Sequence, residues 1–176
     1  MRNLFVLLCS SVALLFLVSA CNTTEDNSSN FTDSAVAFGE GFIKETYSID
    51  EAKPDYNDMS AESLIDAQEE FSSFLTEDEF EELANRRFFL MPLEAASVQN
   101  STISVQNIEL KQYDRDQDES NSIDFDHSFT LIFTDQEGNE VDEVEIKGQM
   151  TIVETENGLN IDRYYDSEIP MDMLNP

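Results

Sequence analysis

Basic residues are scarce in this sequence. Nine Lys and Arg residues stand against 38 Asp and Glu residues, and the formal net charge is -29. A general nucleic-acid-binding protein gathers Lys and Arg in a patch that neutralises phosphates, whereas the only adjacent basic pair here is Arg86 and Arg87. We therefore expect no nucleic-acid partner.

The surplus of carboxylates has two interpretations. Acidic side chains can capture cations or attract a basic partner, or they can form a solvated surface that keeps the protein soluble. The acidic residues are spread along the chain rather than clustered, so we favour the solvated surface.

Cysteine and glycine are also scarce, and each scarcity excludes a class of site. Of the two Cys, Cys9 lies in an apolar N-terminal run that we expect to be removed, so no disulfide is expected. Five Gly leave little room for a phosphate-binding loop, and neither zinc-ligand spacing nor a Ser nucleophile elbow is present. The sequence thus predicts no cofactor.

Residues 1–20 have the pattern of a signal peptide. Arg2 supplies positive charge, residues 4–18 are almost wholly apolar, and the small residues Ser19 and Ala20 follow. The apolar run is shorter than the ~20 residues that a membrane-spanning helix needs, and no basic flank follows it. We expect a removable segment rather than a membrane span.

Residues 17–21 (Leu-Val-Ser-Ala-Cys) resemble the bacterial lipoprotein box, in which a small residue precedes an obligatory Cys. The resemblance implies cleavage between Ala20 and Cys21, diacylglycerol on the thiol of Cys21, and acyl chains such as palmitate that hold the protein on a membrane. It implies an extracytoplasmic protein that is lipid-anchored in a bacterial cell envelope. The alternative is a chance Cys after an ordinary secretory signal.

The remainder divides into a polar segment and one domain. Residues 21–30 are rich in Asn, Thr, Ser and acidic residues and are expected to form a flexible tether. Residues 31–176 have the size of a single domain, and most of the 13 Phe and five Tyr fall in them, so a hydrophobic core is expected despite the acidic composition.

Three helices are expected at the start of this domain. Thr32 or Asp33 can cap the first, Ser60 can cap the second, and residues 76–79 (Thr-Glu-Asp-Glu) have the capping-box pattern that opens the third. Apolar residues recur at helical spacing in all three helices. We interpret these Phe-rich stripes as core rather than as a groove for a partner helix.

Two strands are expected after the helices. Residues 87–91 are interpreted as a strand that Pro92 ends or breaks. Residues 102–113 are interpreted as a longer strand, with a β-bulge near Gln106 and Asn107, where the apolar residues change parity.

Residues 123–165 predict a three-stranded antiparallel meander. Apolar and polar residues alternate over residues 123–133, 144–152 and 159–165, and turn signals separate the three runs. The tail beyond Tyr165 is expected to be irregular. Together these elements predict an α+β fold in which two or three N-terminal helices pack on a curved antiparallel sheet of four or more strands.

This order of elements resembles the nuclear transport factor two-like (SnoaL-like) α+β cone. The likeness is carried by residues 38–47, the helix pair over residues 64–84, and the strands around residues 147–150 and 159–162, where Gly148 suits a strand that bends. The sequence departs from such domains near the end of the last strand, where Arg-Tyr-Tyr stands in place of the common Trp. The resemblance implies a cavity that some relatives use as an enzyme pocket and others as a binding or assembly surface.

His127 is the only His and the only candidate for catalysis. It lies on the apolar parity of its strand, between Phe125 and Phe129. A His beside a carboxylate can do acid–base work, whereas a lone His in an apolar row is usually core. Asp124 and Asp126 are close in sequence but point to the opposite face.

Two further groups of residues are weaker candidates. Tyr47, Tyr56 and Tyr165 can line a ligand pocket, although buried Tyr with a bonded hydroxyl is the more common case. Asp114, Asp116 and Asp118 match the first three ligand positions of a calcium loop. The loop lacks the required Gly and the bidentate Glu, so we interpret it as solvated and expect no metal.

We expect a non-enzymatic envelope lipoprotein that binds a small ligand or an envelope protein partner. Two alternatives stay open: an isomerase- or dehydratase-like enzyme centred on His127, and an assembly component of a secretion or conjugation machine. A pocket with a carboxylate near His127 would favour the enzyme. A filled core with an exposed apolar sheet face would favour assembly.

Overall fold

A computed structural model describes residues 23–50, 56–113, 121–167 and 169–174. The chain divides into two compact units, Met1–Ser34 and Ala35–Pro176. Helix α1 (Thr23–Tyr47) begins in the first unit, and all other described elements belong to the second.

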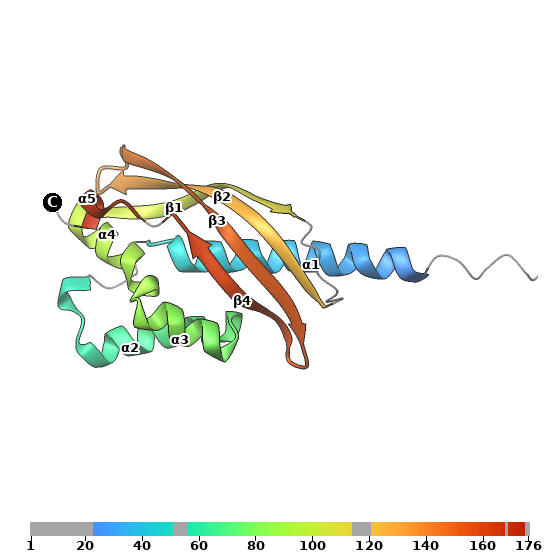
Figure 1. Ribbon diagram of the computed structural model, residues 1–176. Helices are drawn as coiled ribbons and strands as arrows, with labels where there is room; N and C mark the ends of the chain where they lie inside the picture. The colour runs from blue at the N-terminus through green and yellow to red at the C-terminus, as the bar shows by residue number, and fades with distance from the viewer. Residues whose placement is uncertain (1–22, 51–55, 114–120, 168, 175–176) are drawn as a thin grey trace, which may run out of the picture. The chain divides into compact units, whose positions relative to one another are not determined.

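Four helices precede a four-stranded sheet, and 3-10 turns connect several of them (Figure 1). After α1 come η1 (Tyr56–Asp58), α2 (Ala61–Glu69), η2 (Glu70–Phe74), α3 (Glu77–Asn85), η3 (Phe88–Leu90) and α4 (Met91–Gln99). The strands are β1 (Ser101–Gln112), β2 (Ser122–Asp135), β3 (Glu140–Thr155) and β4 (Gly158–Asp166), followed by the short helix α5 (Met171–Leu174). The predicted α+β class is confirmed.

The sheet is antiparallel with the strand order β1-β2-β3-β4, and β2, β3 and β4 form the predicted three-stranded meander. The strands are long and curved (Figure 1). The predicted bulge in β1 is also confirmed, because the register with β2 shifts between Gln106 and Glu109, and Asn107 has a φ of 53°. Alternate residues of β2 are buried, including Phe125, Phe129 and Phe133, so one face of the sheet forms the core.

Helix α1 packs against this buried face. Ala35, Phe42 and Ile43 are fully buried on one side of the helix. Gly39 allows the close approach, because a Cβ there would lie 2.7 Å from a methyl group of Leu110 and 2.9 Å from the sulfur of Met150. The apolar side of α1 is therefore part of the core, as predicted.

Residues 87–91 are not a strand, and that prediction was wrong. Arg87 has a φ of 60° and precedes η3, which leads directly into α4 with Pro92 in its first turn. Pro is favoured there because the first helical N–H groups need no partner within the helix. Phe88, Phe89 and Leu90 are all buried, and such a short apolar run does not distinguish a strand from a buried turn of helix.

The chain termini of the domain also differ from expectation. Helix α1 begins at Thr23, not at Thr32 or Asp33, so residues 23–30 of the expected tether are helical. The tail, expected to be irregular, contains α5.

The predicted cap of α2 is confirmed, since the backbone N–H of Ser63 donates to Oγ of Ser60 at 3.1 Å. No helix in the described part of the chain combines the length and apolarity needed to cross a membrane.

Candidate functional site

His127 lies inside the aromatic core. Its side chain is 3% exposed and stacks between Phe129 and Tyr164, with ring centroids 5.9 and 5.0 Å away. Within the described residues neither ring nitrogen has a hydrogen-bond partner. Burial lowers the pKa of His127 to about 4, against a smaller raising effect of Asp126, so the imidazole is neutral at pH 7.

The surroundings of His127 do not form an acid–base pair. Asp126 lies on the opposite face of β2, where Nε2 of Gln149 donates to its Oδ1 at 2.9 Å. General acid–base catalysis needs a substrate proton within hydrogen-bond reach of the imidazole. His127 lines neither of the two surface hollows whose linings are given in the following paragraphs.

Tyr47 and Asp166 form a buried hydrogen bond between the ends of two elements. The hydroxyl of Tyr47, the last residue of α1, donates to Oδ2 of Asp166, the last residue of β4. Burial raises the pKa of Tyr47 and that of the neighbouring Tyr164 well above their usual range. The arrangement fastens the end of α1 to the end of β4.

The other candidate residues are dispersed. The hydroxyl of Tyr56 accepts a hydrogen bond from Arg87, whose guanidinium carbon lies 5.9 Å from the centroid of the Tyr56 ring. Tyr165 is 61% exposed on β4. Neither these two nor Tyr47 lines either cleft, so the structure does not bring the three Tyr together.

Cys21 and the three Asp of the acidic loop, Asp114, Asp116 and Asp118, lie outside the described residues. Within the described ranges no three His, Cys, Asp or Glu side chains are grouped so that they could hold a metal ion.

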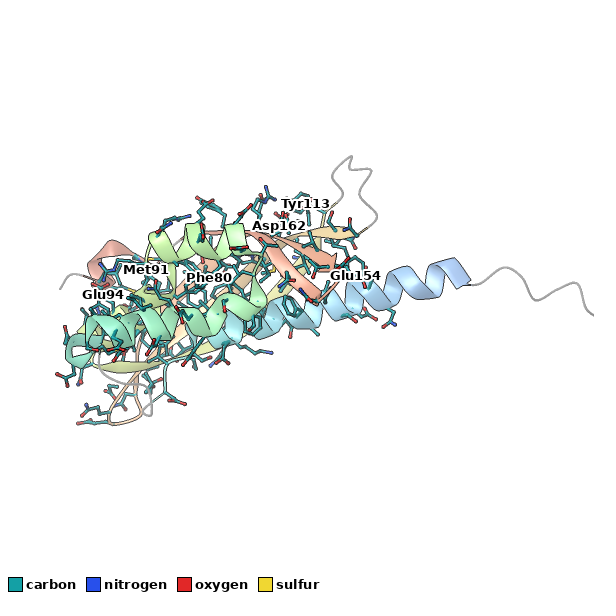
Figure 2. All side chains as sticks on the ribbon, turned by 90° about the horizontal axis from the view of Figure 1, so that it is seen from below. Phe80, Met91, Glu94, Tyr113, Glu154 and Asp162 are labelled. Atoms are coloured by element: carbon teal, nitrogen blue, oxygen red, sulfur yellow. The ribbon has the colours of Figure 1, made fainter. Side chains whose placement is uncertain are left out.

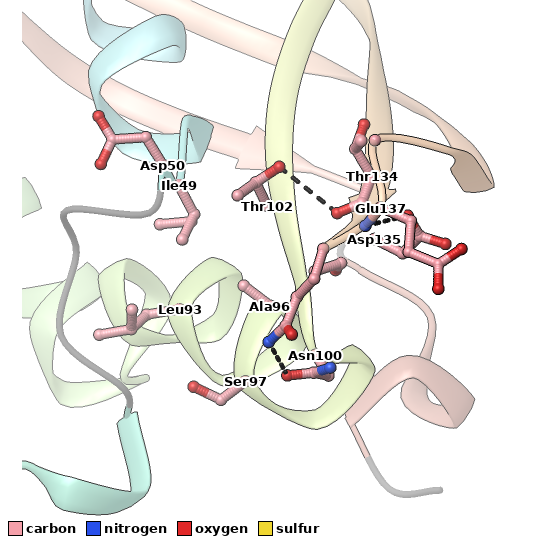
Figure 3. A pocket seen from close by; sticks show the side chains of 13 residues that line it. Ile49, Asp50, Leu93, Ala96, Ser97, Asn100, Thr102, Thr134, Asp135 and Glu137 are labelled. Carbon is pink, nitrogen blue, oxygen red and sulfur yellow. Dashed lines mark hydrogen bonds between the residues drawn. The ribbon is translucent and has the colours of Figure 1, made fainter.

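A hollow lies between α4, the start of β1 and the β2–β3 turn (Figure 3). We call it the hairpin cleft, and its volume is about 710 Å³. Its lining comprises Ile49, Asp50, Leu93, Ala96, Ser97, Asn100, Ser101, Thr102, Thr134, Asp135, Gln136, Glu137 and Gly138. Figure 3 shows Ile49, Leu93 and Ala96 on one side and the acidic Asp135 and Glu137 on the other.

The acidic side of the hairpin cleft is held by a closed turn. Oδ1 of Asp135 accepts hydrogen bonds from the backbone N–H groups of Glu137 and Asn139, at 2.8 and 2.9 Å. These bonds lower the pKa of Asp135. Nε2 of Gln136 donates to Oδ1 of Asn100 at 3.1 Å, which ties the turn to the end of α4.

A smaller hollow of about 260 Å³ lies between the end of α1, α2 and η3, and we call it the helix cleft. Its lining comprises Glu45, Thr46, Ile49, Met59, Ser63, Asp66, Ala67, Glu70, Phe71, Phe89, Leu90 and Leu93. Ile49 and Leu93 therefore line both clefts. Oγ1 of Thr46 is buried without a hydrogen-bond partner among the described residues.

Sequence reasoning missed both clefts. The turn between the second and third strands was predicted. Helix α4, which supplies Leu93 and Ala96, was not predicted, because residues 87–91 were interpreted as a strand that ends at Pro92. The usable signal was Pro92, which is as compatible with the first turn of a helix as with the end of a strand.

No protein-family model and no curated protein matches this chain. Several solved structures resemble it, and they include the following two. A periplasmic fragment of TraM is 13% identical with a TM-score of 0.52, over 78% of this chain and 98% of that one. An IcmL-like type IV secretion system protein from Legionella pneumophila is 11% identical with a TM-score of 0.56, over 79% and 93%. At such low identity the likeness shows the fold alone.

Proposed function

We propose that this chain is an extracytoplasmic, lipid-anchored envelope protein that acts by binding another protein, as an assembly component of a secretion or conjugation machine. The observation that carries the proposal is the pair of open clefts, whose linings include neither His127 nor Tyr164. Two solved structures support it, since the TraM fragment is periplasmic, the IcmL-like protein is a type IV secretion system protein, and both share the fold. The resemblance to the α+β cone is part of the same proposal.

The environment of His127 weighs against the enzymatic alternative. The imidazole is stacked on aromatic rings, it is neutral at pH 7, and it lines neither cleft. An isomerase or dehydratase would need a substrate beside this ring, and aromatic side chains fill that space. We retain protein binding as the better supported function.

The outer face of the sheet is not the proposed binding surface. Asp126, Gln149 and Tyr165 pair across three strands on this face, so it is polar. Within the described residues the large apolar side chains that are exposed are Ile65, Val141 and Tyr165, at 55, 52 and 61%. We expected an assembly protein to have a broad exposed apolar face on its sheet, and the described residues do not form one. The candidate binding surface is therefore the pair of clefts.

The proposed anchor depends on residues 1–30. Residues 1–20 would be removed as a signal peptide, Cys21 would carry the lipid, and the following polar residues would separate the domain in residues 31–176 from the bilayer. Labelled palmitate should be incorporated into the full chain and not into Cys21→Ala, which should leave the membrane fraction. A Cys21→Ala protein that stays membrane-bound would contradict the anchor.

Protein binding can be tested by extraction of the full chain from the cells that produce it. In mild detergent the protein should migrate in native electrophoresis as a discrete complex larger than a single chain, and the complex should persist after purification through a tag. Migration as a single chain at every detergent concentration that preserves the membrane complexes would contradict the proposal.

A further inference from the structure

The hairpin cleft and the helix cleft share an apolar floor. Ile49 and Leu93 line both, and they are 9% and 7% exposed. Two backbone hydrogen bonds to Ile103, of 2.9 and 2.7 Å, hold Ile49 against the edge of β1. Ile49, one of the two residues of this floor, is therefore fixed to the sheet.

The rims of both clefts carry one sign of charge. Glu45, Asp66 and Glu70 line the helix cleft, and Asp50, Asp135 and Glu137 line the hairpin cleft. Among the residues that the structure describes, neither lining includes a Lys or Arg. Carboxylates along both parts of one groove sum to a negative potential that attracts basic side chains.

Thr46 is an independent sign of a ligand. Thr46 lines the helix cleft and is 2% exposed, and its Oγ1 has no hydrogen-bond partner among the described residues. A buried hydroxyl without a partner is costly, so such groups are normally satisfied by protein, water or ligand. A polar group of a bound segment would satisfy it.

We infer that the two clefts form one docking groove for a basic amphipathic segment of a partner protein, with apolar side chains on Ile49 and Leu93 and flanking Lys or Arg at the acidic rims. The inference rests on the proposed protein-binding function and names its site and its partner chemistry. A small cation would satisfy the rims and leave the apolar floor exposed, whereas an amphipathic segment covers both.

The test uses the purified full chain and a fluorescein-labelled synthetic peptide that repeats the pattern Lys-Leu-Leu-Lys. Two further peptides serve as probes: one with every Leu replaced by Ser and one with every Lys replaced by Glu. Fluorescence anisotropy should show the Lys/Leu peptide binding at least about tenfold more tightly than either, because the groove uses both charge and apolar contact. Equal binding of the Lys/Ser peptide would overturn the inference.

Two charge-reversal variants locate the site. Glu70→Lys with Glu137→Lys changes both rims, and Glu154→Lys with Glu156→Lys makes the same change in net charge near the β3–β4 turn. Figure 2 shows Glu154 at the opposite end of the domain from Glu94 in α4. All four Glu are exposed, and thermal denaturation would verify that both variants fold.

The rim variant should weaken the Lys/Leu peptide at least about tenfold, and the control variant should weaken it less than about threefold. Equal weakening would mean attraction by overall charge and would overturn the groove. That result would leave the protein-binding function standing, because native electrophoresis of the extracted complex measures it separately.

Discussion

Oε1 of Glu79 in α3 accepts a hydrogen bond of 2.7 Å from the backbone N–H of Tyr164 in β4. Because β4 is an edge strand, its outer N–H groups have no neighbouring strand to bond. Glu79 supplies the acceptor, and its burial raises the pKa of the carboxyl despite the opposing effect of this hydrogen bond. The carboxyl group of a helical residue thus supplies the hydrogen-bond acceptor for one N–H group at the edge of the sheet.

Replacement of Glu79 should show the value of this contact. Glu79→Ala leaves a buried N–H unpaired, and we expect the free energy of unfolding to fall by about 1–3 kcal/mol in urea denaturation. Glu79→Gln keeps an acceptor oxygen and should lose less. Asp78→Ala, an exposed acid in the same helical turn, is the matched control and should cost less than about 1 kcal/mol. Equal losses for the two Ala variants would contradict the role of the hydrogen bond.

Gly148 in β3 lies close to the backbone of β4 and to His127. A Cβ there would lie 1.9 Å from the carbonyl oxygen of Tyr165 and 2.8 Å from Cε1 of His127. Gly148→Ala must therefore displace the backbone of β4, and we expect a loss of at least about 3 kcal/mol or failure to fold. Gly41→Ala meets no atom within 4 Å and lies in a helix, so it should gain roughly 0.5–1 kcal/mol. Thermal midpoints that coincide for the two variants would contradict the close packing at Gly148.

The sheet was predictable because its signal is local. Burial on one face makes apolar residues alternate along β2 and β3, and Gly138 and Gly158, both with positive φ, lie at the turns. The bulge at Asn107 was predictable for the same reason, since an extra residue reverses the parity of the pattern.

Contacts between distant segments were not predictable. The capping-box pattern at residues 76–79 is local, yet Thr76 makes no side-chain cap and Glu79 bonds to Tyr164 instead. The clefts depend on Ile49 meeting Leu93 and Ile103, which no periodicity encodes. His127 was placed on the buried face correctly by alternation, but its missing hydrogen bonds are visible only in three dimensions.

Thr46 gives a prediction that bears on the groove. Thr46→Val removes a buried hydroxyl that has no partner among the described residues and keeps the shape of the side chain, so the free protein should gain about 1 kcal/mol of stability. Thr102→Val is the control, since Oγ1 of Thr102 donates to the carbonyl oxygen of Thr134 at 3.5 Å, and it should lose a little stability. A loss of stability in Thr46→Val would show that the hydroxyl has an internal partner and would remove one support of the docking groove.

The imidazole of His127 should not titrate in the physiological range. Because burial lowers its pKa to about 4, its NMR ring-proton shifts should stay constant between pH 8 and about pH 5.5. The protein has one His, so the resonances need no assignment by mutation. Titration near the unperturbed value of about 6.5 would mean that water reaches the ring, and it would reopen the enzymatic hypothesis.

The same pKa makes stability depend on pH with a defined sign. Above the unfolded pKa of about 6.5 both states carry a neutral ring, and below it the unfolded chain takes up a proton that the folded one does not. Stability should therefore fall as the pH drops from about 6.5 toward 4, by about 3 kcal/mol in all. Glu79, with its raised pKa, acts in the opposite direction, so the measurement is the difference between the wild type and His127→Phe at each pH. That difference should change across this window and stay constant above it, whereas a difference independent of pH would mean that the pKa of His127 is the same in the folded and the unfolded protein.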